Sequence, residues 1–166
     1  ENIYLFGIGG NALKNQGIDN LFNISEINVM GLIEVLPKVI KINKIINKTV
    51  DKIIEMNPDI IFTVDSPDFT LRVARRIKSK KKELKIIHYV APSVWAWRPG
   101  RIKTVKKSVD HLLTILPFEK KIFDSHNITT TFVGHPITEV DLRDYENHKI
   151  NKPDSLQKEI FLVMPG

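Results

Sequence analysis

Short apolar runs alternate with longer amphipathic stretches along the chain, and this alternation limits the folds open to it more than any other feature. Six apolar runs are expected to form strands: residues 3–8, 59–64, 85–90, 111–116, 130–133 and 160–164. The stretches expected to form helices are residues 28–56, 67–81, 101–108 and 117–126, with one or two helical turns over 11–16. Strands separated by helices predict βαβ units, and strands that are apolar throughout predict a parallel sheet buried on both faces. The sequence therefore predicts an α/β fold with a parallel sheet flanked by helices.

The composition excludes several classes of protein. The 166 residues are enough for one domain with a substantial core, and they include no cysteine, which excludes a disulfide scaffold, a thiolate metal site and a cysteine nucleophile. No apolar run approaches the roughly 20 residues of a membrane-spanning helix. The net charge of +6 favours an anionic partner such as a phosphorylated substrate, a lipid headgroup or a nucleic acid, although a general bias toward lysine would produce the same charge.

The expected helix over residues 28–56 changes character along its length. From residue 35 onward, apolar side chains fall on one face and lysines on the other, as in a helix that packs on a single core. In its first part, the apolar residues spread over about half of the helix circumference. These residues are Leu32, Ile33, Val35, Leu36 and Val39. Either a second element buries this apolar arc, or the arc contacts a membrane surface. Pro37 is expected to bend the helix or restart it.

Two aspartates follow the expected strand over residues 59–64. Asp65 comes directly after it, and Asp68 lies three residues further on, at the start of the next expected helix. Ligands bind at the carboxyl edge of an open parallel sheet, so this position favours a catalytic or binding role. The alternative is structural, because an Asp or Ser before Pro67 is suited to capping the helix and Asp68 to stabilising its first turn.

The segment over residues 91–101 follows the next strand, at the same edge of the sheet. It contains both tryptophans of the chain, Trp95 and Trp97, together with Arg98 and Arg101. Arginine can bind a phosphate through two hydrogen bonds, and an exposed tryptophan is costly unless it packs or binds. The two interpretations are a ligand-binding loop and a structural plug of the sheet's end with solvated arginines.

Four further features carry weaker signals. His88 lies inside an expected strand and is interpreted as a satisfied core residue, whereas His135 follows a strand and is interpreted as part of a turn. Residues 7–10 form at best a partial phosphate loop, because they lack the full Gly-x-Gly-x-x-Gly spacing. The basic run over residues 78–82 is expected to be a solvated helix end. No pair of histidines has the spacing of metal ligands, so neither a metal nor a cofactor is expected.

Several segments, taken in order, resemble one enzyme family. They are residues 29–31 (Val-Met-Gly), 34–36 (Glu-Val-Leu), 65–69 (Asp-Ser-Pro-Asp-Phe), 88–98 (His-Tyr-Val-Ala-Pro-Ser-Val-Trp-Ala-Trp-Arg), 116–119 (Leu-Pro-Phe-Glu) and 134–136 (Gly-His-Pro). This set is similar to lipid-A-disaccharide synthases, and the tryptophan-containing segment is its most specific part. The resemblance runs from about residue 3 to the last residue given.

The resemblance implies an inverting, Rossmann-like glycosyltransferase of the GT-B type with two domains. Members transfer 2,3-diacylglucosamine from its UDP conjugate to 2,3-diacylglucosamine 1-phosphate, and the products are UDP and a β-1,6-linked disaccharide phosphate. They act as peripheral proteins at the cytoplasmic face of the inner membrane of Gram-negative bacteria, without a cofactor. The remaining alternatives are another GT-B sugar-nucleotide enzyme such as an epimerase, a basic module that binds nucleic acid, and a non-catalytic remnant of a split gene.

The resemblance also implies roles for individual residues. Asp65 matches the family's essential aspartate and is expected to be the base, in a desolvated crevice that raises its pKa. The residues expected to contact the acceptor sugar are Asp68, Ser93, Trp95, Arg98, Arg101 and His135. By their charge, the two arginines are suited to its 1-phosphate. The apolar arc from residue 32 to 39 is expected to contact the membrane that holds the acylated substrates.

Departures from the family pattern indicate a fragment. The family begins with a strand and a Gly-Glu-x-Ser-Gly-Asp loop, which this sequence lacks, and it continues after Pro165-Gly166 with Ser-Arg, whose arginine is essential. We expect residues 1–140 to form the acceptor-side domain, 141–158 a connecting segment and 159–166 the first strand of a UDP-binding domain. Such a fragment is expected to be inactive alone.

Overall fold

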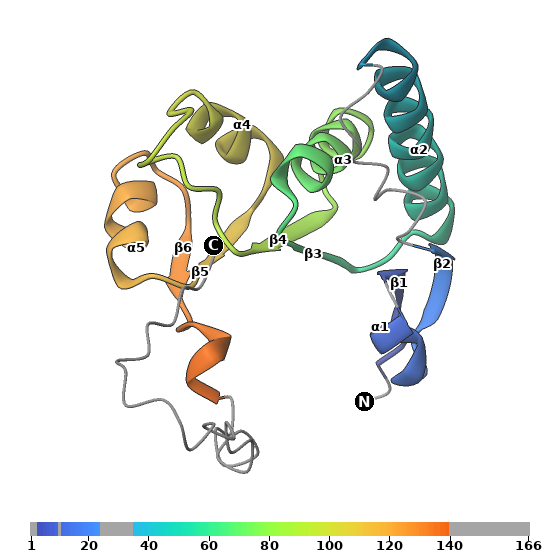
Figure 1. Cartoon of the computed structure of the whole chain (residues 1–166), viewed down its shortest axis with the longest axis horizontal. Coiled ribbons are helices and arrows are strands. Elements are labelled where there is room, and N and C mark those ends of the chain that lie inside the picture. Colours follow the sequence, from blue (N-terminus) through green and yellow to red (C-terminus); the bar gives the residue numbers. More distant parts are fainter. Residues whose placement is uncertain (1–2, 10, 24–34, 140–166) are drawn as a thin grey trace, which may run out of the picture. The chain divides into compact units, whose positions relative to one another are not determined.

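The structure is a computed structural model that describes residues 3–9, 11–23 and 35–139 (Figure 1). The chain divides into two compact units, residues 1–134 and 135–166, and all elements up to β6 belong to the first. Several expectations fall outside the described residues. These are the first part of the long helix with Leu32 and Ile33, the connecting segment over 141–158 and the strand within 159–166. They remain predictions.

Four parallel strands form the main sheet of the first unit. They are β3 (Ile60–Val64), β4 (Lys85–Tyr89), β5 (His111–Thr114) and β6 (Thr130–Phe132), and they lie side by side in that order. The helices that connect them are α3 (Pro67–Lys80), α4 (Arg101–Ser108) and α5 (Pro117–Asp124). Parallel strands require such crossover connections. The predicted α/β fold, with a Rossmann-like parallel sheet flanked by helices, is confirmed.

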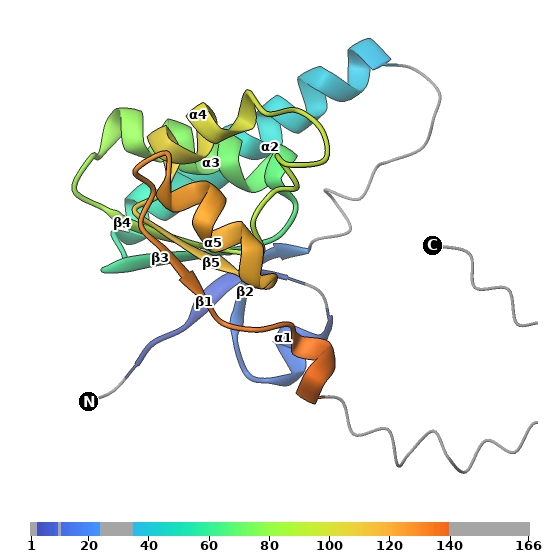
Figure 2. The same ribbon diagram turned by 90° about the vertical axis from the view of Figure 1, so that its left-hand side faces the viewer.

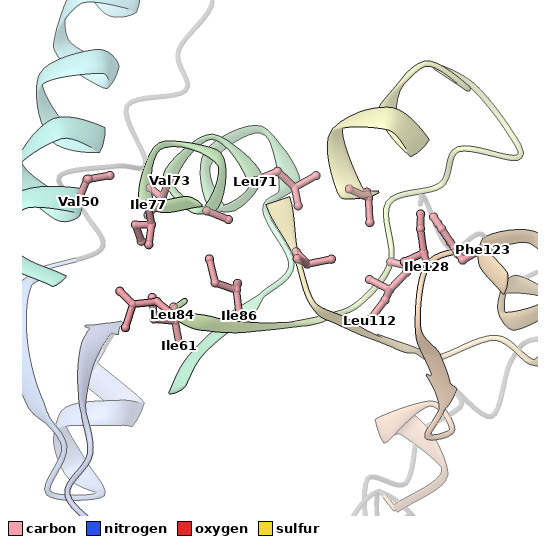
Figure 3. Close-up of a cluster of buried hydrophobic side chains, with 14 of the residues drawn as sticks. Val50, Ile61, Leu71, Val73, Ile77, Leu84, Ile86, Leu112, Phe123 and Ile128 are labelled. Atoms are coloured by element: carbon pink, nitrogen blue, oxygen red, sulfur yellow. The ribbon is translucent and has the colours of Figure 1, made fainter. Parts of the chain in front are cut away.

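The core lies between the helices and one face of this sheet. Ile61, Ile86 and Leu112 come from β3, β4 and β5, and each is at most 7% exposed. Figure 3 shows Ile86 pointing toward the side chains of α3, which include Leu71 and Ile77. The removal of this apolar surface from water is the main stabilising contribution to the fold.

The other face of the sheet is open in the part of the chain that the structure describes. Side chains of β3 alternate between the two faces, and Ile60, Phe62 and Val64 are 58%, 55% and 53% exposed. The ring of Phe62 stacks on that of Tyr89 in β4, with centroids 6.5 Å apart. The expectation that both faces are buried is therefore not met by these residues. The reason is that α3, α4 and α5 all lie on the same side of the sheet, as Figure 2 shows, and their buried apolar side chains belong to one cluster.

The long helix α2 (Val35–Met56) packs through the face that the sequence predicts. Ile46 and Val50 are 0% and 1% exposed and belong to the core. Arg76 of α3 joins the two helices, because its guanidinium donates to Asn47 Oδ1 at 2.9 Å. Amphipathic periodicity therefore predicts the packing of this helix correctly.

The described part of α2 begins at Val35 and continues without interruption through Pro37. Because the residues before Val35 lie outside the described part of the chain, the expected bend or restart at Pro37 remains a prediction. Proline is tolerated in the first turn of a helix, where its missing N–H costs no helical hydrogen bond. The backbone of Leu36 and Val39 is helical, but the packing of the side chains from Val35 to Val39 lies outside what the structure describes. Their membrane contact remains a prediction.

The first residues form a small separate sheet. The parallel strands β1 (Phe6–Gly9) and β2 (Asp19–Asn23) pair around α1 (Asn11–Asn15). The strand expected over residues 3–8 therefore begins three residues later, and Ile3, Tyr4 and Leu5 are exposed. β2 is not predicted by the sequence, since its residues Asp-Asn-Leu-Phe-Asn lack the apolar run of a buried strand.

Three strands of the main sheet end one or two residues earlier than their apolar runs predict. β4 ends at Tyr89, β5 at Thr114 and β6 at Phe132. The residues that follow leave the sheet at its carboxyl edge. This edge carries most of the side chains with candidate roles.

Candidate active site

Two neighbouring strands are followed by left-handed backbone at the carboxyl edge of the sheet. Val64 of β3 pairs with Tyr89 of β4, and the residues that follow them, Asp65 and Val90, have φ values of 48° and 72°. Ser66 continues the turn with a φ of 46°. A positive φ is uncommon outside glycine, and such backbone persists only where the surrounding structure holds it. The turn after β3, with two successive residues of this kind, therefore sets the position of Asp65.

Hydrogen bonds hold the backbone of Asp65 on both sides. Its N–H donates to the Tyr89 carbonyl at 2.9 Å, and the Thr70 hydroxyl donates to the Asp65 carbonyl at 2.8 Å. Ser66 makes no side-chain cap to α3, so the helix-capping interpretation is wrong at this residue. The Asp65 side chain is exposed, and the described residues do not form the desolvated crevice predicted around it. The carboxylate is accessible to a ligand that brings a hydroxyl group.

His88 lies in β4 within electrostatic range of Asp65 and is fully buried. Burial lowers its pKa from 6.5 to about 4, although the negative charge of Asp65 and the backbone of Val90 raise it in part. Its Nδ1 lies 2.8 Å from Thr63 Oγ1, and its Nε2 finds no hydrogen bond of normal geometry in the described part of the chain. The imidazole is therefore neutral near pH 7, and the predicted core histidine is only half satisfied.

Asp68 joins the first turn of α3 to the start of α4 and to the loop that precedes it. Its carboxylate accepts a hydrogen bond from Arg101 Nη2 and lies 3.7 Å from Arg98 Nη1. Both guanidinium groups lie over the Trp97 ring, at 4.4 Å for Arg98 and 5.9 Å for Arg101 from its centroid. The structure therefore brings these four residues together. The interpretation of solvated arginines is wrong for Arg101, whose side chain is 18% exposed.

Trp95 is anchored to the start of α5. Its Nε1 donates to Glu119 Oε1 at 3.3 Å, and its ring meets that of Phe118 edge-on, with centroids 5.1 Å apart. Glu119 is 2% exposed, and its other oxygen accepts the Leu116 N–H at 3.1 Å. Trp95 itself remains 47% exposed, so it is not a buried plug. Glu119 is not predicted as a site residue, although a Glu at the third position of a helix is a capping signal.

Ser93 and His135 each contact residues close to them in the chain. Ser93 is exposed, and its carbonyl accepts the N–H groups of Ala96 and Trp97 at 3.2 and 3.3 Å, which turns the loop. His135 belongs to the second unit, where its Nδ1 accepts the Ile137 N–H at 3.1 Å. It precedes the short helix η2 (Pro136–Glu139), as the turn interpretation predicts. Its role toward an acceptor sugar remains a prediction.

The basic run over residues 78–82 is not uniformly solvated. Lys78 is 14% exposed, and its ammonium lies 2.6 Å from Asp110 Oδ2 and 2.7 Å from the Leu84 carbonyl. Partial burial raises the pKa of Asp110. The hydrogen bonds from Lys78 and from the Ile86 N–H lower it by more, so the pKa of Asp110 lies below its ordinary value of 3.8. The predicted solvated helix end is therefore wrong at Lys78, which ties α3 to the sheet.

Metal-binding groups and membrane-spanning helices can be sought only in residues 3–9, 11–23 and 35–139. Within these ranges, no group of three or more His, Cys, Asp or Glu side chains is arranged to hold a metal ion. Across the same residues, no helix combines the length and the apolar character needed to cross a membrane.

Comparisons with known proteins give a consistent result. A family model described as lipid-A-disaccharide synthetase matches residues 1–166. Curated relatives carry the name lipid-A-disaccharide synthase, and three of them illustrate the similarity. The protein of Rickettsia bellii is 46% identical over 140 residues, which cover 84% of this chain and 37% of the relative. That of Ruegeria pomeroyi is 45% identical over 131 residues, with coverages of 79% and 32%. That of Alcanivorax borkumensis is 40% identical over 172 residues, with coverages of 100% and 44%. The chain thus spans less than half the length of the curated relatives it matches.

Proposed function

The chain belongs to the lipid-A-disaccharide synthase family, and on this basis we propose that the whole protein is an inverting glycosyltransferase. It transfers 2,3-diacylglucosamine from its UDP conjugate to the 6-hydroxyl of 2,3-diacylglucosamine 1-phosphate. The observation that carries the proposal is the placement of Asp65, an exposed carboxylate on a strained and hydrogen-bonded turn at the carboxyl edge of a parallel sheet. Ligands of open α/β sheets bind at that edge.

In this proposal Asp65 is the general base. As the 6-oxygen of the acceptor attacks the anomeric carbon, the carboxylate accepts the hydroxyl proton, and the bond from that carbon to UDP breaks with inversion. A base must lie within hydrogen-bond distance of the proton it accepts, so the fixed turn after β3 contributes by positioning. Because burial keeps His88 neutral near pH 7, it places no positive charge beside the base.

The arginines of the site provide the acceptor's phosphate with a partner. Arg98 and Arg101 lie together over Trp97, and guanidinium groups bind phosphate oxygens through paired hydrogen bonds. Asp68 pairs with both arginines in the absence of substrate, and the 1-phosphate replaces it when the acceptor binds. We propose Ser93 and Trp95 as further contacts of the acceptor, and the same role proposed for His135 rests on the family resemblance alone.

The remaining assignments follow from the acylated substrates. We propose a peripheral protein at the cytoplasmic face of the inner membrane, in contact with the bilayer through Leu32, Ile33, Val35, Leu36 and Val39. Residues 1–140 form the acceptor-side domain, 141–158 connect it to a UDP-binding domain, and 159–166 begin that domain. The 166 residues alone are inactive in this account, because the UDP site lies in the second domain.

The test uses a polypeptide of the relatives' full length that contains this chain. It is incubated in detergent micelles with UDP-2,3-diacylglucosamine and 2,3-diacylglucosamine 1-phosphate, and the products are measured by mass spectrometry. Equal amounts of UDP and disaccharide phosphate are expected, and both should depend on the acceptor. Conversion of the UDP-sugar to an epimer, or release of UDP that is unchanged when the acceptor is omitted, would contradict the proposal.

A further inference from the structure

His88 is a buried polar side chain that takes no part in the proton transfer itself. It is 0% exposed, and its Nε2 has no hydrogen bond of normal geometry within the described residues. A buried nitrogen without a partner destabilises a fold, and an apolar residue of similar shape would avoid this cost. A group of this kind in a native protein needs a reason other than stability. His88 is therefore a candidate for a functional role.

The other ring nitrogen of His88 joins two strands. Thr63 of β3 and His88 of β4 are paired in register. His88 Nδ1 lies 2.8 Å from Thr63 Oγ1, and the Thr63 hydroxyl donates to the Ile87 carbonyl at 3.2 Å. Side chains alternate along a strand, so this pair lies on the same face of the sheet as the buried Ile61 and Ile86. It therefore links β3 to β4 on the side of the helices, one residue before each strand ends.

Asp65 depends on the same two strand ends. Its N–H donates to the carbonyl of Tyr89, the residue directly after His88, at 2.9 Å. Val90 follows with a φ of 72°, and its N–H donates to the Leu113 carbonyl at 3.1 Å. The charge of Asp65 and the backbone of Val90 both raise the pKa of His88, so the imidazole lies close to both. His88 is therefore placed to hold the strained backbone that carries Asp65.

We propose that His88 is a positioning residue for the general base. Through Thr63 and the backbone of Val90 it fixes the ends of β3 and β4, and these ends fix the turn that carries the Asp65 carboxylate. A displacement of about 1 Å at a reacting group can lower a rate about a hundredfold. Since His88 is fully buried, it touches no substrate, and its effect should fall on kcat and not on KM. The inference rests on the proposed function, because it takes Asp65 as the base.

A purely structural role predicts a different pattern. If His88 only filled the core, its replacement would lower stability and turnover together, and an apolar residue of similar volume would restore both. A positioning role predicts that the apolar variant is at least as stable and yet slower. The reason is that such a variant removes the unpaired Nε2 together with the contact to Thr63.

The experiment measures steady-state kinetics and thermal unfolding of a full-length polypeptide that contains this chain. His88→Leu should lower kcat by at least about tenfold and leave KM for both substrates within about twofold. Its melting temperature should be at or above that of the unsubstituted enzyme. Thr63→Val, which removes the hydroxyl alone, should also lower kcat. The two substitutions together should cost no more than His88→Leu, because they remove one shared contact.

Two comparisons separate the contact from the size of the ring. His88→Asn places an amide near the position of Nδ1 and should recover turnover, whereas His88→Gln places its amide near Nε2 and should not. His111→Leu is the matched control, because His111 Nε2 lies 2.8 Å from Thr131 Oγ1 in a similar contact between β5 and β6. This variant should retain turnover, since His111 begins β5 and the site lies beyond the carboxyl ends of the strands.

Hydrogen exchange followed by mass spectrometry gives a readout that needs no catalysis. In His88→Leu and in Thr63→Val, the segment that contains the Asp65 N–H should exchange faster than in the unsubstituted enzyme. The segment that contains the Val133 N–H, which donates to the Thr114 carbonyl at 3.0 Å, should exchange as before.

Unchanged kcat with unchanged exchange around Asp65 in His88→Leu would overturn the inference. A raised KM at normal kcat, or a melting temperature that falls in step with turnover, would do the same. Equal loss of turnover in His111→Leu, or no difference between His88→Asn and His88→Gln, would also contradict it. If the unsubstituted enzyme forms no disaccharide, the proposed function fails instead, and exchange around Asp65 still decides whether His88 holds the turn.

Discussion

Arg101 and Asp68 form an ion pair that links the first residue of α4 to the first turn of α3. The arginine is 18% exposed and the carboxylate is 77% exposed, so the positive partner is held in the structure while the negative one remains accessible. Arg98 lies 3.7 Å from the same carboxylate oxygen. An anion that binds the same donors of the two guanidinium groups therefore competes with Asp68.

Replacement of Asp68 by asparagine should increase the affinity of the site for phosphate. The substitution removes the competing charge, and since an exposed ion pair contributes at most about 1 kcal/mol, the gain should be up to about fivefold. Titration of the 166-residue chain with inorganic phosphate, followed by tryptophan fluorescence, measures the change because Trp97 contacts both arginines. Asp124→Asn, which breaks the pair with Lys120, is the control. Weaker phosphate binding by Asp68→Asn would show that the carboxylate organises the arginines instead of competing for them.

Trp95→Phe should destabilise the fold through the loss of the hydrogen bond from Trp95 Nε1 to Glu119. The ring that packs against Phe118 is kept in part, but the buried Glu119 loses the donor at 3.3 Å, at a cost of about 1–2 kcal/mol. Urea denaturation measures the free energy of unfolding. Trp97→Phe is the matched control, because no hydrogen bond of Trp97 Nε1 is found within the described residues. Equal losses in the two variants would mean that Glu119 does not depend on Trp95.

His88 should make the free energy of unfolding depend on pH between about 6.5 and 4. Its pKa is about 4 in the folded chain and 6.5 in the unfolded one, so the unfolded state binds the proton more strongly within this range. The stability present above pH 6.5 should fall by about 3 kcal/mol as the pH approaches 4. His88→Gln should lose less over the same range, whereas His126→Gln, at an exposed position, should behave as the unsubstituted chain.

The ion pair between Asp110 and Lys78 does not interfere with this measurement. The pKa of Asp110 is below its ordinary value of 3.8, so its contribution is lost only as the pH falls below that value. Urea denaturation of His88→Gln and of the unsubstituted chain at pH 7.5 and 4.5 therefore gives the contribution of His88 as a difference. An unchanged pH dependence in His88→Gln would contradict its assignment as a buried neutral group.

Much of the fold is predictable from the sequence because parallel strands and amphipathic helices leave direct patterns. Apolar runs locate β3 to β6, and the 3.6-residue period of α2 identifies Ile46 and Val50 as core residues. β2 escapes prediction because a short polar strand carries no such pattern. Register also explains why Asp65 and Val90 share one edge, since parallel strands end on the same side.

The details of the site are less accessible from sequence because they depend on contacts between distant residues. Arg101 and Asp68 are 33 positions apart, and Trp95 and Glu119 are 24 apart, so no local rule joins them. The positive φ at Val90 is also unpredictable, because an isolated valine avoids it and only the surrounding structure imposes it. The exposure of Asp65 likewise follows from the arrangement of the loops and not from its position after an apolar strand.

The apolar arc at the start of α2 yields a further prediction. Leu36→Ser with Val39→Ser should weaken binding of the chain to vesicles, since the proposal places both side chains against the bilayer. Sedimentation with vesicles of equimolar phosphatidylglycerol and phosphatidylcholine measures the bound fraction. Unchanged binding together with a lower free energy of unfolding would mean that the two residues belong to the core instead.

The central claim, that Asp65 is the base of a glycosyl transfer, is tested most directly by Asp65→Asn in the full-length polypeptide. Asparagine preserves the shape of the side chain but cannot accept the proton, so turnover should fall by at least about a hundredfold while the unfolding transition is unchanged. Asp59→Asn, an exposed aspartate before the other end of β3, should retain turnover. Near-normal disaccharide formation by Asp65→Asn would contradict the account.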